Sequence, residues 1–255
     1  MSFLDEILEG KREEIAALEA SRPDLSAAPP VRDLFAALAQ GPAPRFIAEV
    51  KRASPSEGPI RPDLDPVDTA VRYAAAGAAA ISVLTDRRWF DGSLAALAAI
   101  RAAVEVPVLC KDFLVAPVQV DAARAAGADA CLLIVAALPG DRLAELLACV
   151  RRRGMAALVE VHDAEERDRA VQAGATIVGV NSRDLHTFSV DLAVAERLVP
   201  GLPSGVVAVA ESGLRGPDDA ARMVRAGARA CLVGTALVRS PDPGRELARW
   251  IASCG

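Results

Sequence analysis

Short apolar runs recur along the chain, and each of five runs ends where a polar residue begins. Burying an unpaired charge costs several kcal/mol, so a packed core should exclude such residues. The apolar runs cover 46–50, 106–110, 155–159, 176–180 and 206–210. The polar residues at their downstream ends are Glu49, Lys51, Lys111, Glu160, Asn181, Glu211 and Ser212. This pattern is typical of parallel strands whose carboxyl ends meet at one open mouth.

A weak internal repeat places a glycine after an alanine-rich helical segment and just before an apolar strand. Four positions show it, namely Gly77, Gly127, Gly174 and Gly227, which lie 50, 47 and 53 residues apart. Glycine accepts the left-handed conformation that ends many helices. Each interval is long enough for two strand–helix units, so the repeat predicts eight strands.

We expect these strands near 46–51, 79–85, 106–111, 130–136, 156–161, 176–181, 206–211 and 230–234, with helices between them. Strands that alternate with helices run parallel through right-handed crossovers. Eight such units close into a barrel, so the predicted fold class is α/β, a single (β/α)8 TIM barrel. An open doubly wound sheet is the alternative, but no GxGxxG motif follows the first strand.

Residues 1–45 precede the first strand and carry two helical patterns separated by prolines. We interpret them as an N-terminal helical cap on a barrel formed by 46–255, all within one domain spanning 1–255. Its first twenty residues alternate apolar and acidic positions at helical spacing, unlike a basic signal peptide.

Composition narrows the range of partners. Acidic and basic residues are interspersed, the net charge is −5, and aromatic residues make up 4% of the chain. This excludes a basic stripe or a stacking platform for nucleic acid. The longest apolar run is half the length of a membrane span, so we expect no membrane partner and a cytoplasmic location. The cysteines form no CxxC pair, and neither His162 nor His186 has a partner at metal-ligand spacing, so we expect no metal site.

Strand alternation indicates which polar side chains share the barrel interior. Glu49 and Lys51 lie two residues apart and point the same way, and Lys111 and Glu160 point inward by the same parity. Amines beside carboxylates in a partly dry pocket can donate and accept protons near neutral pH. One strand-end charge alone would more simply serve solubility, but four at matching ends favour a site.

The loops after the strands suggest an anion site. The segment 52–58 after the first strand is too long for a minimal turn. Turns at Ser212–Gly213 and Gly234–Thr235 follow the seventh and eighth strands, where barrels commonly hold a phosphate. Arg183 in the sixth loop could add a positive charge, although a single loop arginine is as often a solvated one.

Seven sequence blocks together resemble the indole-3-glycerol phosphate synthase family. In chain order they read FIAEVKRASPSEG, SVLTDRRWFDGS, VPVLCKDF, ALVEVH, VGVNSRDL, VAESG and LVGTALV. They occur with the family's order and spacing, and the resemblance covers about residues 3 to 250.

The resemblance implies a lyase that cyclises 1-(2-carboxyphenylamino)-1-deoxyribulose 5-phosphate with loss of carbon dioxide and water, a step of tryptophan biosynthesis. It implies that Lys111 is the general acid at the substrate carbonyl and that Glu160 is the base. Lys51 would hold the carboxylate or act as the acid in dehydration, and Glu49 would orient a lysine. Asn181 and Glu211 would position hydroxyl and amine groups.

The resemblance also implies the binding residues and partners. Phosphate and ribulose contacts would come from Ser54, Arg183, Ser212, Gly213, Gly234 and Thr235. The anthranilate ring would lie against Trp89, Phe113 and Leu132. No cofactor is implied beside the phosphorylated small-molecule substrate. We expect a monomer, with a homodimer as the alternative.

One departure stands out, because Glu57 occupies a position where many family members have lysine in S-P-S-K-G. We expect altered affinity or loop motion there rather than lost chemistry. Two other functions stay open from the residues alone. An inward lysine could form a Schiff base in an aldolase or isomerase acting on another keto-sugar phosphate. A sugar-phosphate binding protein without turnover is the second.

Overall fold

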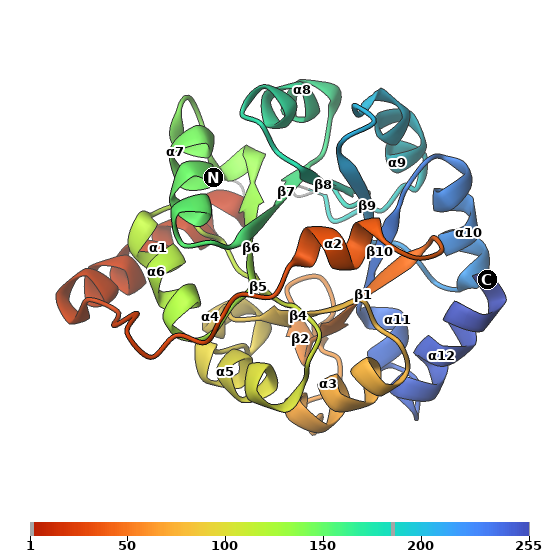
Figure 1. Cartoon of the computed structure of the whole chain (residues 1–255), viewed down its shortest axis with the longest axis horizontal. Coiled ribbons are helices and arrows are strands. Elements are labelled where there is room, and N and C mark those ends of the chain that lie inside the picture. Colours follow the sequence, from red (N-terminus) through yellow and green to blue (C-terminus); the bar gives the residue numbers. More distant parts are fainter. Residues whose placement is uncertain (1–2, 185–186, 255) are drawn as a thin grey trace.

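The computed structural model describes residues 3–184 and 187–254, and it contains a closed barrel of eight parallel strands (Figure 1). The strands are β1 (Arg45–Val50), β4 (Ala80–Leu84), β5 (Val108–Lys111), β6 (Ala130–Ile134), β7 (Ala156–Val161), β8 (Ile177–Asn181), β9 (Val207–Glu211) and β10 (Ala230–Val233). Neighbours along the chain pair in order, and β1 closes the ring by pairing with both β4 and β10. The predicted (β/α)8 barrel is therefore confirmed, and the predicted strands match the observed ones to within about two residues.

Helices surround the barrel as an outer layer (Figure 1). They are α3 (Pro66–Ala75), α5 (Leu94–Ala103), α6 (Pro117–Ala125), α7 (Arg142–Arg152), α8 (Ala164–Gln172), α9 (Ala193–Leu198), α10 (Pro217–Arg225) and α12 (Pro243–Cys254), with 3-10 turns η1 (Val135–Ala137) and η2 (Val199–Gly201). The short helices α4 (Arg87–Phe90) and α11 (Thr235–Val238) lie instead at the carboxyl ends of the strands. Gly77 and Gly127 follow α3 and α6 with φ of 98° and 93°, as the repeat predicted. Among the described residues, no helix is both long and apolar enough to cross a membrane.

Two separate hydrophobic layers show which way each strand residue points. Ile47, Leu109 and Leu158 belong to the cluster inside the barrel. Cys110 and Val159, one residue further along their strands, belong to the larger cluster between barrel and helices. The predicted alternation is confirmed, and it turns Glu49, Lys111 and Glu160 toward the interior; the exposed fractions of Glu49 and Glu160 are 6% and 1%.

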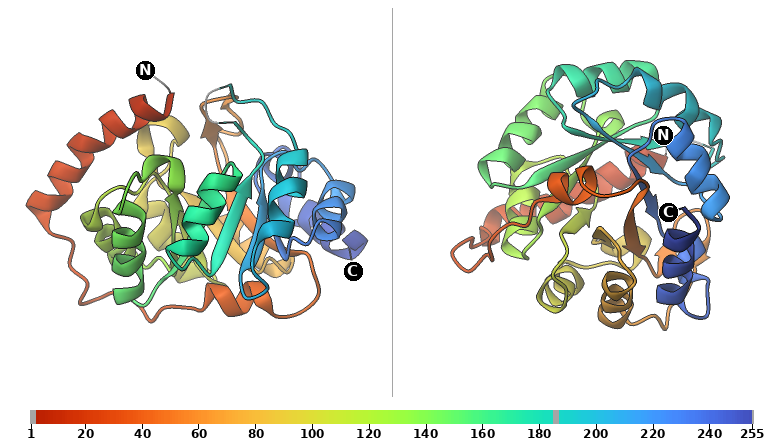
Figure 2. Two further views of the ribbon diagram at one scale, coloured as in Figure 1. Left: turned by 90° about the horizontal axis from the view of Figure 1, so that it is seen from above. Right: turned by 45° about the vertical axis from the view of Figure 1, so that its right-hand side comes forward.

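The N-terminal extension contacts both ends of the barrel. Leu34 and Leu38 of α2 (Leu34–Ala39) are fully buried within the interior cluster, beside residues at the amino ends of the strands. In contrast, α1 (Phe3–Ser21) packs along α6, and its first turns reach the opposite, carboxyl end. Figure 2 shows the connecting segment running from one end to the other. The two predicted helices are confirmed, but the extension covers more than one end.

A short hairpin lies between β1 and α3, where the sequence suggested only a loop. Its strands are β2 (Ala53–Ser54) and β3 (Gly58–Pro59), paired antiparallel. Ile60 and Arg61 both donate their backbone N–H to the carbonyl of Arg52, which ties the base of the hairpin to the end of β1. The hairpin therefore stands over the carboxyl mouth of the barrel.

Candidate active site

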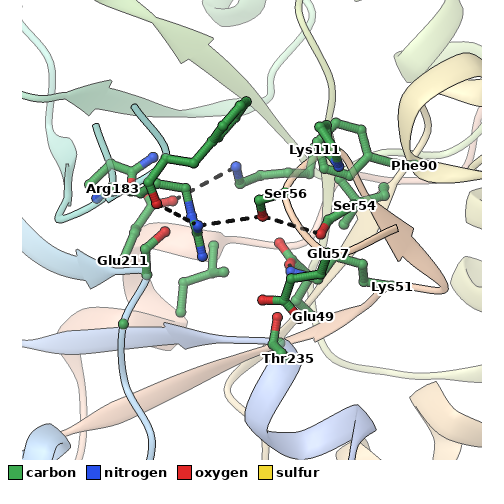
Figure 3. Close-up of a pocket in the computed structure, with 18 of the residues that line it drawn as sticks. Glu49, Lys51, Ser54, Ser56, Glu57, Phe90, Lys111, Arg183, Glu211 and Thr235 are labelled. Carbon is green, nitrogen blue, oxygen red and sulfur yellow. Dashed lines mark hydrogen bonds and ion pairs between the residues drawn. The ribbon is translucent and has the colours of Figure 1, made fainter. Parts of the chain in front are cut away.

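A cavity of about 550 Å³ opens at the carboxyl ends of the strands. Its polar lining includes all six predicted catalytic residues, namely Glu49, Lys51, Lys111, Glu160, Asn181 and Glu211. Figure 3 shows side chains from β1, β5 and β9 converging on this space. The barrel topology thus brings together residues that lie up to 162 positions apart, from Glu49 to Glu211.

Glu49 and Lys51 form an ion pair at the end of β1, with Lys51 Nζ 3.2 Å from Glu49 Oε1. Ser82 of β4 donates a hydrogen bond to the other oxygen, Oε2, at 3.4 Å. The carboxylate fits because residue 234 is glycine, since a Cβ there would lie 2.6 Å from Oε1. Lys51 therefore enters the cavity with its carboxylate partner already in place.

Lys111 is the central cation of the mouth. Its Nζ lies 3.3 Å from Glu160 Oε2 and 3.9 Å from Glu211 Oε2. Burial alone would lower the pKa of this ammonium, but the carboxylates of Glu160, Glu211 and Glu49 raise it above its ordinary value. Lys111 is therefore held protonated at neutral pH.

The two oxygens of Glu160 have different neighbours. Oε1 accepts a hydrogen bond of 3.1 Å from Asn181 Nδ2, whereas Oε2 faces Lys111. Burial would raise the pKa of this carboxyl, but Lys111, His162 and Asn181 together bring it well below its usual range. Glu160 is therefore an anion with one oxygen anchored and the other beside the reactive ammonium.

Glu211 is the carboxyl that holds a proton most readily. Its side chain is 2% exposed, and Oε1 has no hydrogen-bond partner among the described residues. This oxygen occupies the space that Gly179 of β8 leaves, where a Cβ would lie 1.8 Å away. Burial, followed by the nearby charge of Glu160, raises the pKa of Glu211 to about 8. Two neighbouring carboxyls with separated pKa values are what an acid–base site requires.

His162 stands behind Glu160, although no sequence motif assigned it a role. Its Nε2 lies 3.3 Å from Glu160 Oε1, and its Nδ1 lies 3.0 Å from Glu166 Oε2 of α8. Burial would lower the pKa of the imidazole, but the two carboxylates raise it to about 10. Strand parity could have found this residue, because position 162 follows Glu160 by two, as Lys51 follows Glu49. His186 lies outside the described residues.

Lys11 is a second charged group without a sequence motif, and it joins α1 to the mouth of the barrel. Lys11 of α1 is 2% exposed. Its Nζ lies 2.7 Å from Asp112, 2.8 Å from Asp86 and 2.8 Å from Glu14. Asp112 follows Lys111 directly, and Asp86 caps α4 by accepting the backbone N–H of Trp89. No sequence signal identified Lys11, because lysine in a charged helix ordinarily faces solvent.

The apolar side of the cavity differs in one residue from the expected set. Phe113 and Leu132 line it, as the resemblance implied, together with Phe90. Trp89 instead packs edge-on against Phe3 of α1, with ring centroids 4.9 Å apart. Because α4 turns successive side chains by about 100°, Trp89 and Phe90 cannot both face the cavity.

The expected anion-binding residues all lie around the other side of the cavity. They are Ser54, Arg183, Ser212, Gly213, Gly234 and Thr235. Figure 3 shows Arg183, Ser56 and Ser54 in a row, with Arg183 Nη1 3.4 Å from Ser56 Oγ. In the same part of the cavity lining, Arg239 donates a hydrogen bond of 2.7 Å to Glu57. The carboxylate that departs from the common motif is therefore paired with an arginine of the same cavity.

Within residues 3–184 and 187–254, no group of three or more histidine, cysteine or acidic side chains is arranged to hold a metal ion. The polar groups described above pair with one another instead. The fold and the site together define a (β/α)8 barrel enzyme that works by acid–base chemistry on a small molecule.

Comparison with known proteins gives the family. The model of indole-3-glycerol phosphate synthase matches residues 4–249. The indole-3-glycerol phosphate synthase of Saccharopolyspora erythraea is 52% identical over 99% of this chain and 96% of its own length. That of Mycolicibacterium smegmatis is 52% identical over 99% of this chain and 94% of its own length. The chain belongs to the indole-3-glycerol phosphate synthase family.

Solved structures share the fold at much lower sequence identity. A 3-hexulose-6-phosphate synthase superposes with a TM-score of 0.66 at 16% identity, covering 83% of this chain and all of its own. A thiamine phosphate pyrophosphorylase from Pyrococcus furiosus gives 0.63 at 17% identity, covering 87% of this chain and 98% of its own. These likenesses support the barrel alone.

Proposed function

We propose that this chain closes the indole ring of indole-3-glycerol phosphate in tryptophan biosynthesis. It converts 1-(2-carboxyphenylamino)-1-deoxyribulose 5-phosphate into indole-3-glycerol phosphate, carbon dioxide and water. The observation that carries the proposal is the meeting of Lys51 and Lys111 with three buried carboxyl groups in one cavity, in a chain that belongs to this family.

Lys111 is the general acid of the first step. As the aromatic carbon attacks the ketone, negative charge develops on the carbonyl oxygen and needs a proton. Lys111 is held as an ammonium by its neighbouring carboxylates, Glu160 foremost, so it can supply that proton inside a partly dry site. Its burial places the ammonium at the base of the cavity rather than in solvent.

Glu160 is the base that removes a proton later in the reaction. While Lys111 is charged, Glu160 is a weak base, because the ammonium 3.3 Å away stabilises its anion. Once Lys111 gives its proton to the substrate, that stabilisation disappears and the proton affinity of Glu160 rises. The acid step thereby prepares the base step.

Lys51 binds the substrate carboxylate before it leaves as carbon dioxide, and it can act as the acid when the hydroxyl leaves as water. Glu49 orients it through the 3.2 Å ion pair. Asn181 and Glu211 position hydroxyl and amine groups of the substrate from the ends of β8 and β9.

The remaining cavity accommodates the two ends of the substrate. We assign the anthranilate ring to the apolar side, against Phe113 and Leu132, with Phe90 in place of the expected Trp89, which packs against Phe3 instead. The phosphate lies on the opposite side, between Arg183 and the turns at Ser212 and Thr235.

A Schiff-base aldolase needs a neutral amine, and the environment of Lys111 opposes it. Glu160 and the other acidic groups keep this lysine charged despite its burial, whereas Schiff-base lysines are typically neutralised by desolvation or by another cation nearby. Borohydride trapping of a keto-sugar phosphate on Lys51 or Lys111 would reverse this conclusion.

The test is to mix purified protein with the carboxyphenylamino-deoxyribulose phosphate and follow indole fluorescence, with Lys111→Met as the control. We expect product from the wild type, and from the variant a rate lower by roughly 100-fold or more. Binding of the substrate without any fluorescence from the wild type would overturn the proposal, and another keto-sugar phosphate would then be tried.

We also propose that the protein is a monomer. Among the described residues, the exposed large apolar side chains are Phe35 and Val71, at 37% and 41% exposure. Phe35 lies on α2 and Val71 on α3, which supports the absence of a continuous apolar interface.

A further inference from the structure

His162 is a largely buried, titratable group next to the catalytic residues, and it has no part in the proposed reaction. It follows β7 directly, its side chain is 16% exposed, and it is not part of the cavity lining. It cannot touch the substrate from this position. Any effect on the reaction must therefore pass through Glu160, which lies between the imidazole and the cavity.

Both ring nitrogens of His162 face carboxylate oxygens. Nδ1 is 3.0 Å from Glu166 Oε2, and Nε2 is 3.3 Å from Glu160 Oε1. A neutral imidazole carries one N–H and one lone pair, so one of the two carboxylates would then face a lone pair. Only the imidazolium is attractive to both, and the geometry therefore favours the charged ring.

Glu166 is itself fixed, which makes the ring a rigid support. It lies in the first turn of α8, where its backbone N–H is capped by Asp163 at 2.8 Å. Its Oε2 also accepts the backbone N–H of His162 at 2.8 Å. The imidazole is thus held from the helix side by one carboxylate and presents its other nitrogen to Glu160.

We propose that His162 is a positioning residue for the ring closure: as an imidazolium it fixes Glu160 Oε1 beside Asn181 and leaves Oε2 for proton transfer. The inference rests on the proposed function, because it assigns a role within that reaction. The raised pKa of the imidazole, to about 10, agrees with a ring that stays charged during turnover.

The charged groups around Glu160 determine in which direction its pKa should change when His162 is removed. Glu160 faces Lys111 of β5, His162 at the end of β7, Asn181 of β8 and the carboxyl of Glu211 of β9. Of the two cations, only Lys111 changes its charge in the reaction. Removing the constant cation should raise the pKa of Glu160, so the acidic limb of kcat against pH should move to higher pH.

The test compares His162→Gln and Glu166→Gln with Glu165→Gln, a control in the same turn of α8 whose side chain is exposed. For His162→Gln we expect the acidic limb to shift upward by roughly one pH unit, with KM unchanged. Glu166→Gln should shift it in the same direction by less, and Glu165→Gln should match the wild type. Superimposable profiles for His162→Gln and the wild type, at equal thermal stability, would overturn the inference.

A second measurement does not depend on turnover. The chain has two histidines, so nitrogen NMR of histidine-labelled protein gives two imidazoles, and the His186→Gln variant, which keeps His162, assigns them. We expect the ring of His162 to stay protonated above pH 8 and to lose its proton at lower pH in Glu166→Gln. A neutral ring at pH 7 would overturn the inference even if His162→Gln does not fold. A wild type without turnover would overturn the proposed function instead.

Discussion

At the scale of single residues, the orientation of Glu160 decides what the site can do. Its Oε1 accepts a hydrogen bond from Asn181 and lies 3.3 Å from His162 Nε2, whereas its Oε2 faces Lys111. A proton can therefore arrive at or leave one oxygen without disturbing the contacts of the other. The division of labour between two oxygens of one side chain is what lets a deeply buried acid take part in the reaction.

Replacing Glu160 with Gln should separate chemistry from binding. The amide keeps the shape and one oxygen, but it cannot take a proton, so we expect kcat to fall by roughly 100-fold or more. KM should stay near the wild-type value, since the phosphate and ring contacts remain. Steady-state kinetics measures both quantities, and a near-normal kcat would contradict the role of Glu160 as the base.

Some of these residues could be predicted from the sequence and others could not, for physical reasons. Strand parity and the end of an apolar run were enough to place Glu49, Lys111 and Glu160 in one mouth. His162 obeys the same parity, one residue past β7 as Lys51 is one residue past β1, but a histidine without a partner at metal-ligand spacing carried no signal of a role. Lys11 had no signal at all, because its partners come from two other loops.

At the scale of elements, α1 is tied to the barrel by a buried cation. Lys11 pairs with Asp86 before α4 and Asp112 after β5, and the same helix contributes Phe3 and Ile7 to the cavity wall. Burial would lower the pKa of this lysine, but Asp112 and the other carboxylates raise it above its ordinary value. The helix therefore acts as part of the wall of the site.

Replacing Lys11 with Met should leave Asp86 and Asp112 buried without a counterion. Such a loss costs about 3 to 5 kcal/mol of unfolding free energy. Denaturant unfolding measures it, with Arg12→Met as the matched control on the same helix. Arg12 is exposed and pairs only with Glu9 in the described contacts, so its loss should change stability by no more than about 0.5 kcal/mol. Equal stability of the two variants would contradict the stabilising role of the ion pairs of Lys11 with Asp86 and Asp112.

The hairpin of β2 and β3 has its own anchor in Glu57 and Arg239. The pair joins the hairpin to the residue that follows α11, next to the phosphate side of the cavity. Arg239 is 63% exposed, so the contact is expected to add little stability. Its effect should appear in substrate binding instead.

Replacing Glu57 with Gln should free Arg239 and remove a negative charge from the path of the phosphate. We expect KM to fall by about threefold, a change that matches a weak exposed ion pair, while kcat stays the same. Kinetics at low ionic strength is the measurement, and Arg239→Gln serves as the opposite change, with a higher KM. A raised KM in Glu57→Gln would show that hairpin anchoring outweighs charge.

Element prediction succeeded where the physical signal was local. Apolar runs and helix-ending glycines gave all eight barrel strands, because each depends on residues close together in the chain. The hairpin was missed because its strands have two residues each, too few for an alternating pattern. The path of the N-terminal extension to both ends of the barrel depends on distant contacts, which no local pattern contains.

At the scale of the whole molecule, the buried carboxyl of Glu211 lowers the free energy of unfolding as the pH rises toward 8. Glu211 has a folded-state pKa of about 8, above the ordinary value of 4.5. Between these two pH values the folded protein holds a proton that the unfolded chain has released. The stabilisation is complete below pH 4.5 and is lost as the pH rises through about 8.

Glu211→Gln should therefore be more stable than the wild type at pH 8 and less active. The amide does not ionise, so the gain in Tm should shrink as the pH falls toward 5. Thermal unfolding across this range measures the difference, which we expect to reach a few degrees at pH 8. A Tm difference that does not change with pH would contradict the proton on Glu211.

Two absent side chains shape the site as much as those present. Gly179 leaves the space that Glu211 Oε1 occupies, and Gly234 does the same for Glu49 Oε1. A related barrel could keep every acid and lysine of this mouth yet carry alanine at either position. One methyl group would then turn a carboxylate to another neighbour and change which acid carries the proton. Whether a related barrel keeps the same reaction therefore depends on glycine at these two positions, and not only on the charged residues.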